Sequence, residues 1–238
     1  MRRERGYFST FCPPMADQKT ENSLYERLMR FFVIVVIYTV RYVFYIWFRP
    51  KVTFTDDSVR STRLKSPAVI IANHTNMLDP IMMLAVFFYH RSIVVAKDQI
   101  EDPHFSWALK RAACVIPCDR FNLDTEWALI AKREIEKGNS VIIFPEGKCR
   151  DDGQLNEFKT GFAFLARSTG TPVISVGLDG IYKFGHRTQV VIGAAEKIER
   201  VKGIPSSKHL TERSEYFQKK IWKLKQQALG KSSEEVCP

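Results

Sequence analysis

The sequence predicts an α/β fold: a single domain with a central, mostly parallel β-sheet flanked by helices, preceded by an N-terminal hydrophobic, membrane-anchoring helical segment. Short, unbroken apolar runs such as Ala68–Ala72 (AVIIA) are typical of strands buried on both faces. Their alternation with helical segments predicts a parallel sheet. The long apolar stretch at residues 31–48 predicts the anchoring segment.

Composition and charge limit the class of protein. The chain has 238 residues, of which 45% are hydrophobic and 26% charged, and this excludes a disordered or collagen-like chain. A mean hydropathy of -0.19 excludes a bundle of many membrane spans. The net charge of +10 predicts attraction to nucleic acid, a phosphorylated substrate or an acidic membrane surface. The five cysteines contain no CxxC pair, which favours reduced thiols over a disulfide scaffold or a structural zinc site.

The chain divides into four parts. We expect a polar tail at 1–22, a hydrophobic membrane-associating helical segment at 23–50, a main domain at 51–205, and a basic amphipathic helix with a tail at 206–238. As a helix, residues 31–48 would be about 27 Å long, just short of a bilayer core of about 30 Å. Arg41 would cost roughly 2.5–3.5 kcal/mol near the middle of a membrane. We therefore favour a monotopic or marginally spanning anchor, with a buried core helix as the alternative.

Local signals place the other elements. Strands are predicted at 68–72, 92–96, 115–117, 140–144, 172–176 and 189–192. Helices are predicted at 79–89, 124–137 and 158–168. Pro80 suits a first helical turn, Asp124 can cap the second helix, and Gly138 and Gly170 close the second and third.

A basic amphipathic helix is predicted near the C-terminus. One face carries apolar side chains, namely Phe217, Ile221, Leu224 and Ala228. Lysines lie elsewhere on the helix, namely Lys219, Lys220, Lys223 and Lys225. Such a helix either packs on the domain or lies on anionic lipid.

His74 is the first candidate for catalysis, because it follows the strand 68–72 at the edge where reacting groups gather in open α/β sheets. Asp79 opens the next helix, so its carboxylate can fold back onto the imidazole. Such a pair leaves the second ring nitrogen to remove a proton. The chain has no G-x-S-x-G elbow, so we expect the activated hydroxyl to belong to the substrate. The structural alternative is a capped turn with a hydrogen-bonded histidine.

A second candidate is the turn Phe144–Arg150 (FPEGKCR), which follows the strand 140–144. Its backbone N–H groups and cations can face an anion, and the forked donors of arginine suit phosphate. Lys159, at the start of a helix, and Arg120, after the strand 115–117, are further phosphate-compatible cations. Strand ends on one sheet edge would bring these groups together. A solvated charged turn is the alternative.

Five blocks occur in order over residues 68–178. They are Asn73-His74-x4-Asp79-Pro80, Cys118-Asp119-Arg120, Phe144-Pro-Glu-Gly-x-x-Arg150, Phe158-Lys159-x-Gly161 and Thr171-Pro-Val-Ile-Ser-Val176. They resemble the glycerophospholipid acyltransferases, the PlsC-type lysophosphatidic acid acyltransferase family. The resemblance implies an enzyme with an acyl-CoA or acyl-carrier protein donor, a lysophospholipid acceptor, and neither cofactor nor metal. The expected reaction acylates the sn-2 hydroxyl of 1-acyl-sn-glycerol-3-phosphate and gives phosphatidic acid.

The resemblance also implies roles for individual residues. His74 is the general base and Asp79 its orienting partner. The residues assigned to acceptor binding are Arg120, Glu146, Gly147, Arg150 and Lys159. The chain departs from the family pattern at two sites, since Lys148 replaces the usual Thr and Pro117-Cys118 replaces the usual Phe-Ile. We add Lys148 to the acceptor site, because its extra positive charge there would suit a different head group.

We therefore expect a membrane-associated enzyme, monotopic or single-pass, on an anionic membrane surface, with its active site on the cytoplasmic side. An acyltransferase for another lysophospholipid and a thioesterase or hydrolase with the same dyad are the nearest alternatives. A nucleic-acid-binding module would suit the net charge of +10 but lacks a recognised binding motif, so we expect no nucleic-acid partner. A catalytically silent membrane-interaction protein is the remaining alternative.

Overall fold

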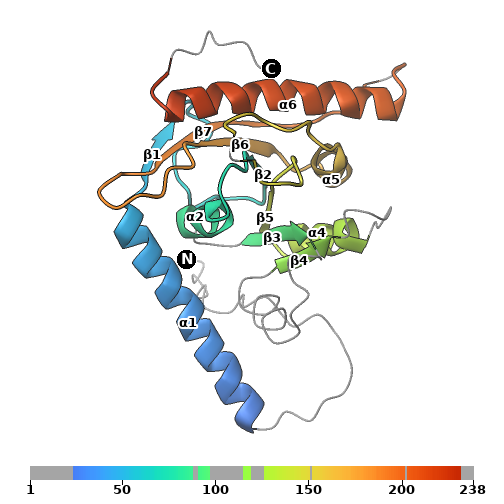
Figure 1. Ribbon diagram of the computed structural model, residues 1–238. Coiled ribbons are helices and arrows are strands. Elements are labelled where there is room, and N and C mark those ends of the chain that lie inside the picture. The colour runs from blue at the N-terminus through green and yellow to red at the C-terminus, as the bar shows by residue number, and fades with distance from the viewer. Residues whose placement is uncertain are drawn as a thin grey trace, which may run out of the picture.

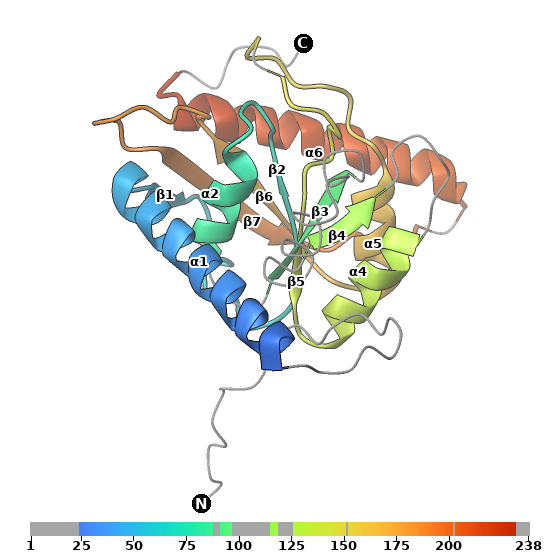
Figure 2. The ribbon, with the colours of Figure 1, turned by 60° about the horizontal axis from the view of Figure 1, so that its bottom comes forward.

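The computed structural model describes residues 24–87, 91–96, 115–118, 126–150, 152–201 and 203–231. The helices in these ranges are α1 (Leu24–Phe48), α2 (Asp79–Val86), α4 (Glu126–Glu136), α5 (Gly161–Thr169) and α6 (Ser206–Ala228). The strands are β1 (Lys51–Phe54), β2 (Val69–Ala72), β3 (Arg91–Ala96), β4 (Val115–Cys118), β5 (Ser140–Ile143), β6 (Val173–Leu178) and β7 (Gln189–Glu196). Helices cover both faces of the sheet (Figures 1 and 2).

The strands form one sheet in the order β1-β7-β6-β2-β5-β3-β4. All neighbours run parallel except β6 and β7. The predicted α/β fold with a mostly parallel sheet is therefore confirmed. β2 lies between β6 and β5, with Val69 opposite Val173 and Val141. All four of its residues are buried, which explains its unbroken apolar run.

Alternate side chains of β2 belong to two different cores. Ile70 and Ala72 pack with Met82 and neighbouring side chains of α2 on one face of the sheet. Val69 and Ile71 pack with side chains of α4, α5 and α6 on the other. A shift of β2 by one residue along its neighbours would turn every side chain to the opposite face of the sheet and so into the wrong core. The position of the residues that follow β2 is therefore well defined.

Two elements differ from the prediction. The strand Lys51–Phe54 was not predicted, since its alternately exposed, partly polar residues lie at the edge of the sheet and lack an apolar run. The third predicted helix begins at Gly161 rather than at residue 158. The reason is that the backbone N–H of Lys159 donates to the carbonyl of Pro145 at 3.0 Å, which holds the preceding residues in a turn.

α6 packs along β6 and β7 (Figure 1), so the alternative in which it packs on the domain is confirmed. The contact is close, because a Cβ on Gly177 would lie 2.3 Å from the carbonyl carbon of Leu224. Lys225 was expected among the basic side chains away from the apolar face. It is instead only 2% exposed, because its ammonium reaches the loop carbonyl of Gly153.

α1 lies beside α2 (Figure 2), and Phe44 and Phe48 near its end pack against the core. Many of its other apolar side chains are exposed, namely Leu28, Phe31, Phe32, Val35, Val36, Tyr38, Tyr42, Val43, Tyr45, Ile46 and Trp47. The buried-core alternative therefore does not describe this helix. Within the described ranges, no helix combines the length and the apolar character needed to cross a bilayer.

Candidate active site

The candidate site lies at the carboxyl ends of the central strands. His74 follows β2, Glu146 follows β5, and Tyr182 lies in the loop after β6. Because β2 runs parallel to both neighbours, these segments meet at one edge of the sheet. This arrangement joins residues that are more than 100 positions apart in the chain, such as Tyr182 and Asp79.

Asp79 is fully buried and accepts hydrogen bonds on both carboxylate oxygens. Its Oδ2 accepts from the backbone N–H groups of Thr75 (2.7 Å) and Asn76 (2.8 Å). The same Oδ2 lies 3.3 Å from Nδ1 of His74, and Oδ1 accepts from the Tyr182 hydroxyl at 2.6 Å. The predicted His–Asp pair is therefore formed. A carboxylate fixed in this way favours a proton on Nδ1 and leaves Nε2 as the proton acceptor.

His74 is held at its ring and at its backbone. The ring packs on Phe144 with centroids 4.6 Å apart, and the side chain is 10% exposed. Its backbone N–H donates to Oε1 of Glu146 at 2.8 Å, and its carbonyl accepts from the N–H of Arg150 at 3.0 Å. The loop after β5 thus fixes the position of the imidazole.

Glu146 is buried, and its carboxylate connects two segments. Oε1 accepts from His74, and Oε2 accepts from the backbone N–H (2.9 Å) and the side-chain amide (3.3 Å) of Asn156. Burial raises the pKa of Glu146 above its usual value, and the hydrogen bonds from the backbone N–H groups of Asn156 and His74 offset part of this rise. The carboxylate therefore supports the loop around His74. A direct contact of Glu146 with the acceptor remains a prediction.

Gly147 and Lys159, two residues assigned to acceptor binding, lie together. Gly147 has a φ of 67°, a left-handed conformation that favours glycine. A Cβ at this position would lie 3.4 Å from Cε and 3.6 Å from Nζ of Lys159. The ammonium group of Lys159 is therefore next to the turn, and its contact with the acceptor remains a prediction.

Arg150 lies on the same loop but is engaged by protein groups. Its Nε donates to both oxygens of Asp152 (2.9 and 3.0 Å), Nη2 also pairs with Asp152, and Nη1 donates to Oδ1 of Asn156 at 3.3 Å. The hydrogen bond from Arg150 lowers the pKa of Asp152. Lys148 is exposed on this loop. Arg120 lies outside the described residues.

Several residues that support the site were missed in the sequence. Tyr182 was overlooked, although a tyrosine soon after a strand that ends at this edge was a usable signal. Asn73 precedes the predicted base, and its side-chain amide pairs with β6 by donating to the carbonyl (3.0 Å) and accepting from the N–H (2.7 Å) of Leu178. No sequence pattern near Asn156 indicated that its side chain contacts the site.

α6 supports the loop from the other side. Its side chains donate to three loop carbonyls: Ser214 to Phe158 (2.9 Å), Gln218 to Asn156 (3.0 Å) and Lys225 to Gly153 (2.5 Å). Burial lowers the pKa of Lys225, while the nearby carboxylates of Glu146 and Asp79 oppose that change. Lys225 is thus a buried cation that partly compensates two buried carboxylates.

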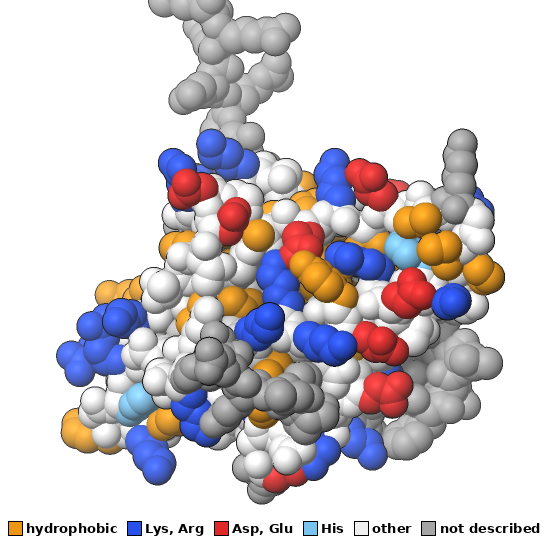
Figure 3. Space-filling model, turned by 90° about the horizontal axis from the view of Figure 1, so that it is seen from above, with side chains coloured by type: hydrophobic (Ala, Val, Ile, Leu, Met, Phe, Trp, Pro, Cys, Tyr) orange, Lys and Arg blue, Asp and Glu red, His pale blue; other side chains and the backbone are white. Residues whose placement is uncertain are grey.

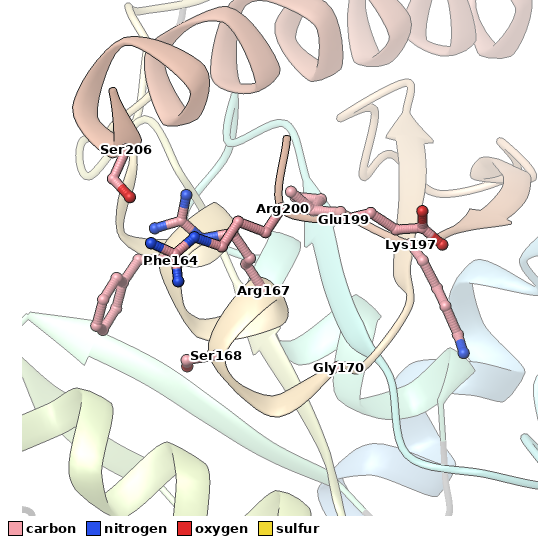
Figure 4. A pocket seen from close by; sticks show the side chains of 9 residues that line it. Phe164, Arg167, Ser168, Gly170, Lys197, Glu199, Arg200 and Ser206 are labelled. Atoms are coloured by element: carbon pink, nitrogen blue, oxygen red, sulfur yellow. The ribbon is translucent and has the colours of Figure 1, made fainter. Parts of the chain in front are cut away.

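Another hollow, of about 550 Å³, lies at the opposite edge of the sheet (Figure 4). Arg167 and Arg200 line it together with Gly170, which precedes β6. Because the candidate site follows the other end of the parallel strands, this hollow is not part of it. On the face seen in Figure 3, Lys and Arg side chains are interspersed with Asp and Glu rather than gathered in one patch.

Comparisons with known proteins identify the family of this chain. A family model described as Acyltransferase matches residues 51–179. The chain is 31% identical over 146 residues to a 1-acyl-sn-glycerol-3-phosphate acyltransferase of Pseudomonas aeruginosa, a match that covers 57% of this chain and 56% of that protein. It is 32% identical over 105 residues to a lyso-ornithine lipid O-acyltransferase of Rhodobacter capsulatus, covering 43% of this chain and 37% of that protein. The chain thus spans about half the length, or less, of these curated relatives.

The fold is also similar to a solved structure, the 1-acyl-sn-glycerophosphate acyltransferase PlsC from Thermotoga maritima. The TM-score is 0.55 at 20% sequence identity, and the match covers 88% of this chain and 83% of that chain. The family model extends over more than half of the sequence and includes His74, Asp79 and the loop after β5. The chain therefore belongs to the acyltransferase family.

Proposed function

We propose that this chain transfers a fatty acyl group from an acyl-CoA or acyl-carrier protein thioester to the sn-2 hydroxyl of 1-acyl-sn-glycerol-3-phosphate. The products are phosphatidic acid and the free thiol. The observation that carries the proposal is the buried His74–Asp79 pair beside the cation-bearing loop after β5. The relatives named as 1-acyl-sn-glycerol-3-phosphate acyltransferases support this acceptor.

The pair suits direct transfer in a ternary complex. Nε2 of His74 takes the proton from the acceptor hydroxyl while the hydroxyl oxygen attacks the thioester carbonyl. The new C–O bond forms, the C–S bond then breaks, and the proton passes to the departing thiolate. Asp79 stabilises the imidazolium in between, which requires a fixed carboxylate such as the one that Thr75 and Tyr182 hold.

The loop cations position the acceptor. Lys148 and Lys159 offer ammonium groups to the phosphate, and Arg150 offers a guanidinium that pairs with Asp152. A phosphate would replace the exposed Asp152 carboxylate, because guanidinium binds both anions through the same fork. A bound phosphate holds the sn-2 hydroxyl near Nε2 of His74, which contributes through orientation.

The exposed apolar side of α1 supports a site that works close to lipid. Trp47 is 55% exposed and contacts Phe184, which is 85% exposed, with ring centroids 5.5 Å apart. Aromatic side chains on an otherwise basic protein suit the boundary between water and an anionic bilayer. The lysolipid would then reach the site from the cytoplasmic membrane surface.

A different head group is the second candidate. Lys148 stands where a Thr is usual, and one relative is named as a lyso-ornithine lipid O-acyltransferase. A thioesterase would use the same pair on water, with no lysolipid required.

One assay separates these functions. Labelled acyl-CoA is incubated with lysophosphatidic acid, lysophosphatidylcholine, lysophosphatidylethanolamine or lyso-ornithine lipid, and lipid products and free thiol are measured together. We expect labelled phosphatidic acid, with thiol release that depends on lysophosphatidic acid and matches the product in amount. Equal thiol release without any lysolipid indicates a thioesterase. A product formed only with another lysolipid corrects the acceptor.

A further inference from the structure

We infer that Tyr182 is a positioning residue that fixes the Asp79 carboxylate and couples the His74–Asp79 pair to the packing of α1. The inference rests on the proposed function, in which His74 acts as the base. The Tyr182 side chain contacts the catalytic pair through its hydroxyl and α1 through its ring. It therefore connects a helix with an exposed apolar surface to the reacting groups.

Among the described residues, the hydroxyl of Tyr182 is the hydrogen-bond donor that reaches the Asp79 carboxylate from outside the segment 74–79. Thr75 and Asn76 donate to Oδ2 and belong to the segment between His74 and Asp79. The Tyr182 hydroxyl donates to Oδ1 at 2.6 Å from the loop after β6. Burial and the nearby Asp79 charge raise the pKa of Tyr182, so the hydroxyl keeps its proton and remains a donor. Without the Tyr182 hydroxyl, the Asp79 carboxylate would lose this hydrogen bond to Oδ1 and would still be held at Oδ2 by Thr75 and Asn76.

The ring of Tyr182 packs against two rings of α1. Its centroid lies 6.0 Å from that of Phe44 and 5.5 Å from that of Phe48, the latter at an interplanar angle of 85°. Edge-to-face packing of this kind is directional, so it fixes the ring orientation as well as its distance. A shift of the end of α1 would therefore move the hydroxyl relative to Asp79.

The backbone of the loop is braced by polar side chains of its own. The Asp179 carboxylate accepts from the backbone N–H groups of Ile181 (3.0 Å) and Gln189 (2.7 Å). The Thr188 hydroxyl donates to the carbonyl of Ile181 at 3.0 Å, and the Thr188 N–H donates to the carbonyl of Phe48 at the end of α1 at 3.3 Å. Movement of α1 would thus act on Tyr182 directly through the ring contacts and also through Thr188. Contact of α1 with lipid would set the geometry of the pair and so the rate of transfer.

The first test is Tyr182→Phe, which keeps the ring and removes only the hydroxyl. We expect kcat to fall about tenfold, with the KM values for acyl donor and acceptor nearly unchanged. The acid limb of the kcat/KM profile should move to higher pH, because a carboxylate with one donor fewer interacts more strongly with protonated His74. The other charged groups around the pair and Tyr182 stay in place, namely Glu146, Lys225, Asp179 and Cys149 if ionised.

Tyr216→Phe is the matched control. Tyr216 also donates to a carboxylate, Glu196, at 2.9 Å, but on the surface of α6 and β7. This variant should keep the wild-type kcat and pH profile. Thermal unfolding of both variants checks that they fold. A Tyr182→Phe enzyme with wild-type kcat and an unmoved acid limb overturns the positioning role.

A double-mutant cycle tests the coupling to α1. Phe48→Leu should lower kcat in the wild-type background but much less in the Tyr182→Phe background, because the hydroxyl that transmits the change is already gone. Equal fold-changes in both backgrounds overturn the coupling.

A substrate-free measurement separates this inference from the proposed function. The NMR signal of the His74 Nδ1 proton, assigned by its loss in His74→Ala, should shift in Tyr182→Phe and not in Tyr216→Phe. A wild type that transfers no acyl group contradicts the proposed function whatever this signal does. An active wild type whose signal is unchanged by Tyr182→Phe contradicts the inference alone.

Discussion

Replacing Glu146 with Gln should destabilise the protein and lower turnover more than it weakens acceptor binding. The carboxylate accepts from the N–H of His74 on one oxygen and from Asn156 on the other. Glutamine has a single carbonyl oxygen, so its NH2 group would face one of these donors. The loss of a hydrogen bond to a charged acceptor costs about 1.5–3 kcal/mol. For a chain of this size, a loss of about 2 kcal/mol lowers the melting temperature by about 4–8 °C.

Thermal and urea unfolding measure the stability, and steady-state kinetics measure kcat and KM. Glu157→Gln is the matched control, because Glu157 is exposed on the same loop and its change should stay within about 0.5 kcal/mol. If Glu146→Gln unfolded like the wild type and raised only the acceptor KM, the carboxylate would bind the acceptor and our account of its support of His74 would be wrong.

The same variant has a characteristic pH dependence. Burial raises the pKa of Glu146 above 4.5, so the folded state binds this proton more tightly than the unfolded state. Stability from this group is therefore present below about pH 4.5 and is lost as the pH rises through the folded pKa. Glu146→Gln removes the titration. Its stability deficit relative to the wild type should shrink as the pH rises through that window, and urea unfolding at several pH values checks the sign. A stability deficit that grew as the pH rose would contradict the predicted sign.

Four further substitutions test three separate parts of the structure. Asp79→Asn should lower kcat at least about 100-fold in a protein with an unchanged circular dichroism spectrum, because an amide cannot stabilise the imidazolium. Retention of most activity would contradict the role of the dyad. Arg150→Ala should raise the acceptor KM, and Asp152→Asn should lower it by removing the competing carboxylate, as initial-rate kinetics would show. Equal KM values would contradict the phosphate contact. Gly177→Ala should destabilise the fold by about 3 kcal/mol in urea unfolding, because its Cβ would lie 2.3 Å from the carbonyl carbon of Leu224. Wild-type stability would show that α6 can move away.

The sequence predicts the central strands well because burial on both faces leaves a simple pattern. β2 carries a continuous apolar run and β6 an apolar run interrupted by Ser175, and both strands were predicted to within two residues. β1 has no such run, because an edge strand that is half exposed needs no continuous apolar face. The burial of Lys225 was not predictable from helical periodicity, since it depends on a loop carbonyl 72 positions away.

The candidate site likewise contains contacts that the sequence predicts and contacts that it does not. His74 and Asp79 are five positions apart, so one turn explains their meeting and the sequence predicts it. Tyr182 and Asn156 meet these groups only through sheet topology and loop conformation, which the local pattern does not specify. The sequence also predicts Arg150 as a phosphate ligand. The structure adds that its guanidinium is hydrogen-bonded to Asp152.

The most direct measurement compares label transfer from acyl-CoA to 1-acyl-sn-glycerol-3-phosphate by the wild type, His74→Ala and His186→Ala. His186 pairs with the Asp179 carboxylate at 2.8 Å but is not part of the His74–Asp79 pair, so it controls for the loss of an imidazole–carboxylate contact. Our account predicts that His186→Ala forms labelled phosphatidic acid and that folded His74→Ala forms none above background. Substantial label transfer by His74→Ala would show that another group removes the proton.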